Sequence, residues 1–383
     1  MTKFSHIEQL IQDLCPSGVE YKTLAELLDY EQPTKYIVRS TEYDDRYKTP
    51  VLTAGQGFIL GYTDETDGIY HASKENPTLI FDDFTTSYHW VDFDFKVKSS
   101  AMKMLRPRKD ADIVFRYVYY AMLGIDYKPE EHARQWISRY GAFEIPVPPL
   151  PIQKEIVRIV DTFDNLIKNI DAEIDARQKE LVLCRRHILN NLDCETKSIS
   201  SLFLLRGGYT PSTKNPEFWT KEGGYPWYTM DDIRQNGRKL DESLRHITEK
   251  AIKGKGLFPT GTIVFATSAT IGEHAILTRP ALTNQRFTAL IPKSDNVYMP
   301  FYYHYGFIVD VWCLQHIKQG GFASVDMNGF ANLQIPLPSL KEQQAIAEKL
   351  DTIEAFIANL NEERALRQQQ YEYYRAKLIS LLK

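Results

Sequence analysis

Apolar residues recur at alternating steps of three and four in two long stretches of the chain, about residues 146–192 and 336–383. The first stretch places apolar side chains at Ile152, Ile156, Ile159 and Phe163 and contains no Pro or Gly after Ile152. This spacing puts one apolar stripe along a helix, as in a coiled-coil seam. The pattern therefore predicts two long helices, each needing an equally long partner.

The two helical stretches are copies of one another. IPVPPLPIQKEI (145–156) and IPLPSLKEQQAI (335–346) open them, and the alignment continues without a gap to Leu192 against Leu382. The identical positions include polar ones, among them Gln153 and Gln343, Asp161 and Asp351, Arg177 and Arg367, and Arg185 and Arg375. Unrelated helices would match mainly at apolar positions, so this is an internal repeat, and we expect the copies to pair antiparallel.

The proline-rich entrances predict rigid joints between a strand and each helix, because proline restricts the residue before it and suits the first helical turn. A PxxP ligand for another domain is the alternative, which the immediately following helix disfavours.

The segments before the helices lack a long helical period. Strand-like runs occur at 77–81, 96–107, 261–267 and 286–292, and aromatic helices are expected at 112–122 and 296–307. We therefore predict an α/β (α+β) fold of two globular domains joined by two long helices that form an antiparallel coiled coil with pseudo-two-fold symmetry. The expected segments are domain 1 (1–145), the first helical region (146–192), domain 2 (193–335) and the second helical region (336–383).

Composition changes this picture only in part. The 383 residues suit two or three domains, and 43% hydrophobic with 12% aromatic residues indicates a globular protein. The net charge of −4 argues against nucleic-acid binding through a global positive field, so any such surface must be local. The sequence shows no secretory or membrane-spanning segment, and we expect a cytoplasmic protein.

Motifs for catalysis or metal binding are not evident. GQGFILG (55–61) lacks the spacing of a dinucleotide loop, and GKGLFPTG (254–261) lacks the Lys-Ser/Thr of a P-loop, so both are interpreted as turns. The four cysteines show no C-x-x-C, which favours reduced thiols. Asn-Pro at 76–77 and at 215–216 stops short of a methyltransferase motif. We expect no catalytic residue, metal or cofactor in this chain.

Side chains that reach phosphates or base edges are instead present on predicted loops and strand ends. Lys96 and Lys98 share one face of an alternating strand, which favours a basic patch, although a solvated strand face explains them equally well. For the loop residues, a side chain that caps or braces a turn is the alternative. The candidate nucleic-acid contacts are Thr53, Gln56, Lys96, Lys98, Lys103, Arg106, Arg234, Ser268, Thr270, Asn284, Gln285 and Arg286.

Three tyrosines in the second helical region, Tyr371, Tyr373 and Tyr374, are spread too evenly round the helix for all of them to be core. Part of this cluster is expected to form a partner surface, and Tyr371 and Tyr374 are the candidate partner-binding residues.

Several stretches resemble the DNA-specificity subunits of Type I restriction-modification systems. GGYTPSTKNPEFWTKEGGYPWYTMDDI (207–233) is similar to the opening of that family's target recognition domain, and FASVDMNGFANLQIPLPSLKEQQAIAEKL (322–350) is similar to its tail motif. In the first domain, PVLTAGQGFILGYTDE (50–65) and SSAMKMLRP (99–107) match another form of the same domain. The first domain is thus a different variant from the second, and the half-sites need not be related.

The resemblance implies two target recognition domains, each reading one half of an interrupted double-stranded DNA sequence. It also implies conserved helices that space the half-sites and dock two modification (methyltransferase) subunits, with S-adenosylmethionine expected on that partner. Whether a restriction (translocase-nuclease) subunit is present stays open. A hypothesis of another class, a coiled-coil scaffold with two protein-binding globules and no DNA role, is compatible with the near-neutral charge.

Overall fold

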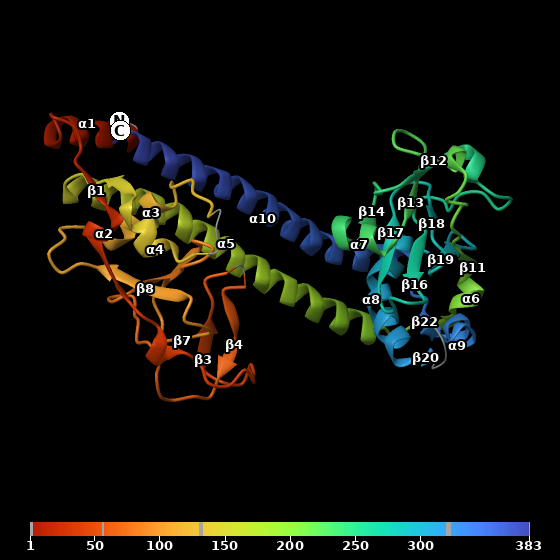
Figure 1. Cartoon of the computed structure of the whole chain (residues 1–383). Coiled ribbons are helices and arrows are strands. Elements are labelled where there is room, and N and C mark those ends of the chain that lie inside the picture. Colours follow the sequence, from red (N-terminus) through yellow and green to blue (C-terminus); the bar gives the residue numbers. More distant parts are fainter. Residues whose placement is uncertain (1–2, 56, 130–132, 319–322, 383) are drawn as a thin grey trace. The chain divides into compact units, whose positions relative to one another are not determined.

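The computed structural model describes residues 3–55, 57–129, 133–318 and 323–382 (Figure 1). The chain divides into two compact units, unit 1 (Met1–Asp171 with Glu363–Lys383) and unit 2 (Ala172–Glu362). Each unit combines a mixed helix and strand domain with parts of both long helices, which confirms the predicted fold class. The units therefore cut across the four predicted segments. No helix in the described part of the chain is both long and apolar enough to cross a membrane.

The two predicted long helices are α5 (Leu150–Asn190) and α10 (Leu340–Ser380). Within unit 1 they run antiparallel, because Phe163 stacks on Tyr374 with ring centroids 5.0 Å apart while the later Asp171 pairs with the earlier Arg364. Figure 1 shows the two helices running alongside each other in this unit.

Within unit 2 the same antiparallel direction holds. Arg177 lies over the ring of Phe356 at 5.8 Å, and Arg185 forms an ion pair with Glu354. Phe356 itself is 44% exposed, whereas Ile353 and Ile357 pack against the core of unit 2.

Unit 1 is built on a four-stranded antiparallel sheet of order β2-β8-β5-β6, with a three-stranded sheet β4-β3-β7 and the pair β1-β9. Its helices are α1 (Lys3–Leu14), α2 (Leu24–Leu27), α3 (Phe115–Met122) and α4 (Gln135–Ser138), with 3-10 turns η1 (Thr34–Tyr36) and η2 (Tyr140–Ala142). Its strands are β1 (Tyr21–Thr23), β2 (Leu28–Glu31), β3 (Thr49–Leu52), β4 (Ile59–Thr63), β5 (Thr78–Asp82), β6 (Tyr88–Val91), β7 (Lys96–Val97), β8 (Met102–Pro107) and β9 (Glu144–Pro146).

Unit 2 is built on a five-stranded sheet of order β11-β19-β16-β17-β14, with a four-stranded sheet β12-β15-β13-β18 and the pairs β10-β22 and β20-β21. Its helices are α6 (Ile199–Leu202), α7 (Met230–Asn236), α8 (Met299–Gln315) and α9 (Met327–Asn332), with 3-10 turns η3 (Pro216–Phe218) and η4 (Glu249–Ala251). Its strands are β10 (Thr196–Ser198), β11 (Phe203–Gly207), β12 (Trp219–Thr220), β13 (Tyr225–Tyr228), β14 (Lys239–Leu240), β15 (His246–Ile247), β16 (Ile263–Ala266), β17 (His274–Leu277), β18 (Leu282–Thr283), β19 (Phe287–Pro292), β20 (Ile317–Lys318), β21 (Ser324–Val325) and β22 (Gln334–Pro336).

The central strands of both sheets are apolar on both faces because each sheet separates two cores. In β5, Leu79 and Phe81 face one apolar cluster while Ile80 faces another. In β16, Phe265 and Val264 divide in the same way between two clusters. Alternate side chains of a strand point to opposite faces, so covering both faces requires a continuous apolar run. This accounts for the strand-like runs in the sequence.

The repeated helix entrances build the same joint twice. In unit 1 the side chain of Gln153 accepts a hydrogen bond from Val114 N at 2.8 Å and donates one to Pro148 O at 2.7 Å. In unit 2 the side chain of Gln343 accepts from Tyr298 N at 2.8 Å and donates to Pro338 O at 2.9 Å.

Both glutamines are fully buried, and each ties the proline-rich entrance of its long helix to the aromatic helix that precedes it in sequence. The strand entering each joint also pairs in one register, Lys22 opposite Ile145 and Lys197 opposite Ile335. The repeat therefore encodes a tertiary joint as well as a helix.

Candidate nucleic-acid interface

Three segments meet at one end of the main sheet of unit 2. Ala266, the last residue of β16, pairs with Phe287, and Thr267 N donates to Arg286 O at 2.9 Å. Ser268 forms an isolated bridge with Ser324. These contacts place the β16–β17 loop beside the turn before β19. The polar residues gathered there, called the loop edge of unit 2, are Thr210, Ser268, Thr270, Asn284, Gln285 and Arg286.

Residues 284–286 have three different roles at this edge. The side chain of Asn284 accepts a hydrogen bond from Arg286 N at 2.9 Å, so it braces the turn. Gln285 is exposed and its carbonyl oxygen accepts from Thr210 Oγ1 at 2.6 Å, which leaves its amide NH2 without a partner among the described residues. The exposed guanidinium of Arg286 has no hydrogen bond or ion pair within the described ranges. Gln285 and Arg286 can therefore reach a base edge without breaking the fold.

The loop after β16 carries backbone strain at its tip. Ala269 has φ +65°, a conformation that residues other than glycine rarely adopt. It lies between Ser268 and Thr270, which are both partly exposed. Its amide donates to Ala323 O at 3.0 Å, which holds the tip against the neighbouring segment. Strain held in place in this way is typical of loops with a function.

Unit 1 repeats this edge with different side chains. The sheet order β2-β8-β5-β6 corresponds to β11-β19-β16-β17, and Thr86, in the turn between β5 and β6, has φ +59°. Among the described residues, Thr86 and Ala269 are the only non-glycine residues with positive φ. Asp83 N donates to Ala101 O at 2.8 Å, as Thr267 N does to Arg286 O in unit 2. The equivalence adds exposed Thr85 to the candidate surface, and no motif in the sequence points to it.

The smaller sheet of unit 1 presents two of the predicted contacts together. Thr53 and Lys98 follow the parallel strands β3 and β7, and Lys98 N donates to Leu52 O at 3.0 Å. Lys98 is exposed, whereas Thr53 is partly exposed and accepts a hydrogen bond from Gly55 N at 3.4 Å. Gln56, the third predicted residue here, lies outside the described residues. These three assignments stay predictions.

The predicted basic patch is wrong for Lys96, and the predicted nucleic-acid contact is wrong for Lys103, because both side chains are buried. Residues 96–107 form two strands, β7 and β8, so Lys96 and Lys98 do not share an exposed face. Lys96 is buried and forms an ion pair with Glu65 at 2.9 Å, and Lys103 is buried with Asp83 at 2.9 Å. A buried paired ammonium is held inside the domain, because removing it would leave its carboxylate uncompensated.

Arg106 and Arg234 lie in different settings. Arg106 is partly buried and stacks over Tyr70 at 4.9 Å, with Nη2 donating to His71 O at 3.4 Å. Arg234 is exposed on helix α7, where a polar loop was expected, and is 3.4 Å from Asp231. Arg234 can swing to a phosphate from there, whereas Arg106 is held in the fold.

The tyrosines of α10 are placed differently from the prediction. Tyr371 packs against the core of unit 1, and Tyr374 stacks on Phe163. Tyr373 is 57% exposed. An exposed helix face is needed to meet a partner, so the structure favours Tyr373 over the predicted Tyr371 and Tyr374.

A partly buried charge network in unit 2 brings together His304, Asp351 and Glu354, whose ligand atoms lie within 4.8 Å of one another. Lys239 Nζ is 3.0 Å from Asp351 and 2.9 Å from Glu354, and Arg185 also pairs with Glu354. Burial lowers the pKa of His304 to about 4. Two cations already neutralise the two carboxylates, so we assign this cluster to ion pairing and not to a metal.

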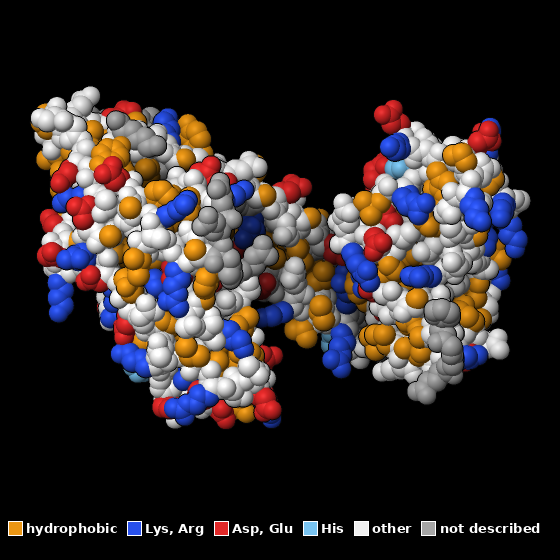
Figure 2. Space-filling model, in the orientation of Figure 1, with side chains coloured by type: hydrophobic (Ala, Val, Ile, Leu, Met, Phe, Trp, Pro, Cys, Tyr) orange, Lys and Arg blue, Asp and Glu red, His pale blue; other side chains and the backbone are white. Residues whose placement is uncertain are grey.

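The charge of the visible surface is mixed. Figure 2 shows Lys and Arg side chains interspersed with acidic and apolar ones over both units. This agrees with the net charge of −4. Any nucleic-acid contact therefore depends on local groups such as those of the loop edges.

The two units have the same sheet order and the same glutamine joint, but different side chains at their loop edges. This combination is typical of a duplicated recognition protein. Both halves match the family described as the Type I restriction modification DNA specificity domain, over residues 16–176 and 191–367. The chain belongs to this family, which confirms the resemblance.

Similar proteins agree with this membership. The Escherichia coli Type I restriction enzyme EcoR124I/EcoR124II specificity subunit is 40% identical over 407 residues, covering 100% of this chain and 98% of that protein. The Escherichia coli EcoprrI specificity subunit is 43% identical over 207 residues, 50% of this chain and 51% of that protein. The crystal structure of the Type I S subunit from M. genitalium has a TM-score of 0.57 at 14% identity and covers 94% of this chain and 96% of that one. It shows the shared fold.

Proposed function

We propose that this chain is the specificity subunit of a Type I restriction-modification complex. Each unit recognises one half of a bipartite double-stranded DNA sequence. The chain itself is non-catalytic, and it directs a methyltransferase partner that carries S-adenosylmethionine. The EcoR124I/EcoR124II protein, which matches this chain over its full length, is named a specificity subunit, and this supports the proposal.

The observation that carries the proposal is the equivalence of the two loop edges. The same turn of the same sheet is strained in both units, at Thr86 and Ala269, while the surrounding side chains differ. A framework common to both units fixes where each unit contacts the DNA, and the loop side chains, which differ between the units, choose the bases. Two unrelated half-sites are what such an arrangement would read.

The joints formed by Gln153 and Gln343 support docking of modification subunits on the helices. Each joint fixes the start of a long helix against its own domain. A partner that binds the helices is then held at a defined position relative to that domain. Two equivalent joints provide for two copies of the modification subunit, and a restriction subunit would join through the same assembly.

The experiment is to co-express this chain with the modification subunit, purify the complex and map methylation across a genome. We expect a bipartite motif that disappears when the chain is deleted. Exchange of residues 193–335 for those of a relative should change only one half of the motif. A complex whose methylation pattern is indifferent to the chain would instead support the scaffold hypothesis, with which the near-neutral charge is compatible.

A further inference from the structure

A pocket of about 440 Å³ lies beside the loop edge of unit 2, between the end of β11 and residues 253–256. β11 pairs with β19 up to Gly207 opposite Thr288, and Gly208 N donates to Phe287 O at 3.1 Å. The pocket therefore borders the strand end that carries Gln285 and Arg286. Its lining is Leu205, Arg206, Gly207, Tyr209, Lys253, Gly254, Lys255, Gly256, Phe258 and Leu282.

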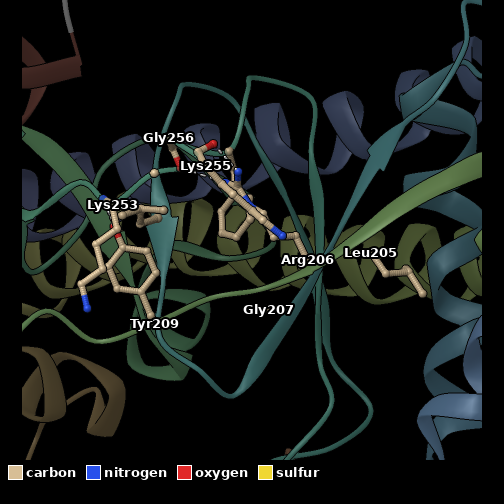
Figure 3. Close-up of a pocket in the computed structure, with 10 residues that line it drawn as sticks. Leu205, Arg206, Gly207, Tyr209, Lys253, Lys255 and Gly256 are labelled. Carbon is tan, nitrogen blue, oxygen red and sulfur yellow. Dashed lines mark hydrogen bonds between the residues drawn. The ribbon is translucent and has the colours of Figure 1, made fainter.

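Three cations surround this pocket, and no described carboxylate pairs with any of them. Lys253 and Lys255 are exposed, and neither has an ion pair within the described residues. The guanidinium of Arg206 donates to Lys255 O at 2.7 Å and to Gly256 O at 3.1 Å, and it lies 4.0 Å over the ring of Phe258. Figure 3 shows Arg206 reaching toward Lys255 and Gly256 while Leu205 points away. The positive charge of the pocket is therefore uncompensated.

The 253–256 segment is held in a shape that leaves two amides available. The carbonyl oxygens of Lys255 and Gly256 accept hydrogen bonds from Arg206. Gly256 N donates to Lys253 O at 2.9 Å, which closes a turn. The amides of Gly254 and Lys255 have no hydrogen-bond partner among the described residues. Tyr209 fixes the start of the segment, since its hydroxyl accepts from Lys253 N at 2.8 Å. Outward amides in a turn next to ammonium groups suit an anion.

Burial also lowers the pKa of the Arg206 guanidinium, which means that its desolvation is not balanced by an acidic partner in the protein. A bound anion would supply that balance.

We propose that Lys253, Lys255 and Arg206, with the amides of the 253–256 turn, bind a backbone phosphate of the DNA strand that crosses the loop edge of unit 2. This site rests on the proposed function and adds a phosphate clamp to it. Contacts to phosphate carry no direct sequence information, so the clamp sets the register of the DNA while Gln285 and Arg286 face the bases. The Gly-Lys-Gly stretch at 254–256 lacks the Lys-Ser/Thr of a P-loop, and it is thus a phosphate-binding turn of a different type.

The test uses the complex of this chain with its modification subunit and a duplex containing the methylated motif. The variant is the double substitution Lys253→Gln and Lys255→Gln, and the control is Lys293→Gln. Lys293 is also exposed but lies just beyond the opposite end of β19. Binding is measured at several salt concentrations. A thermal unfolding curve of each complex checks that the variants are folded.

We expect the double variant to bind more weakly to every sequence, with an unchanged methylation motif. The slope of log K against log salt should become shallower by about 0.9, the value for the one phosphate that the protein no longer neutralises. The Lys293 control should keep the wild-type affinity and slope.

Two results would overturn the clamp. One is a double variant with unchanged affinity and slope, measured beside a wild-type complex that binds its motif specifically. The other is a pocket that binds inorganic phosphate, seen as a thermal shift that the double variant does not show, while DNA binding is unaffected. A wild-type complex without sequence preference would instead contradict the proposed function, so the two failures are distinguishable.

Discussion

Replacing Gln343 with Met tests the joint that the internal repeat encodes. Methionine has nearly the same length and volume, but it cannot make the hydrogen bonds of the amide. The change leaves Tyr298 N, Pro338 O and Asn296 O without the side chain that satisfies them. The matched control is Gln344→Met, one position further along α10, where the side chain is exposed.

The magnitude follows from the number of groups left unpaired. Each buried donor or acceptor without a partner costs about 1–3 kcal/mol. Water can reach Asn296 O and Tyr298 N, since their hydrogen bonds to Gln343 are only partly buried, so we count Pro338 O alone. The expected loss of unfolding free energy is therefore roughly 1–3 kcal/mol, whereas the control should change by less than about 0.5 kcal/mol.

Urea unfolding followed by tryptophan fluorescence gives the stability, and hydrogen exchange at the Tyr298 amide localises the effect. We expect that amide to exchange faster by a factor that corresponds to the decrease in free energy, about tenfold for each 1.4 kcal/mol. Equal stability of Gln343→Met and Gln344→Met, with unchanged exchange at Tyr298, would refute the reasoning that the buried amide holds the joint.

Three further outcomes are expected. Lys103→Met should lower the unfolding free energy by about 3–5 kcal/mol because it leaves the Asp83 carboxylate buried without its cation, whereas the exposed Lys109→Met should be neutral in the same urea titration. His304 has its pKa lowered from 6.5 to about 4 by burial, so the unfolded state binds the extra proton first as pH falls. Stability should then drop by about 3 kcal/mol between pH 6.5 and 4, and His304→Gln should remove that part of the slope in unfolding curves measured across this range. Arg286→Ala should reduce discrimination at one base pair by about 1–3 kcal/mol in competition binding with substituted duplexes; unchanged discrimination would place that side chain away from the bases.

Much of the architecture follows from the sequence because its signals are local. The steps of three and four predict α5 and α10 to within a few residues, and the repeated polar positions predict that the two joints are alike. The runs at 77–81 and 261–267 predict β5 and β16, since a strand covered on both faces must be continuously apolar.

The candidate surface was predicted less well, because exposure is a property of the fold. Lys96 and Lys98 are two residues apart and look equivalent on an alternating strand. The chain leaves the strand after Val97, so one lysine is buried with Glu65 and the other is exposed. For Tyr371, Tyr373 and Tyr374, the choice of the exposed ring depends on which face of α10 its own unit covers.

The sequence by itself determined the duplication, the two long helices and the family. The helices follow from the apolar periodicity, the duplication from the repeated residues, and the family from the motifs that match it. Only the tertiary structure decided which polar side chains form the loop edges. Residues 210, 268–270 and 284–286 meet through pairing of β16 with β19 and of its neighbours, and pairing between strands distant in sequence leaves no local pattern. The same holds for the phosphate pocket, where Arg206 meets residues 253–256 across almost fifty positions of the chain and no spacing rule connects them.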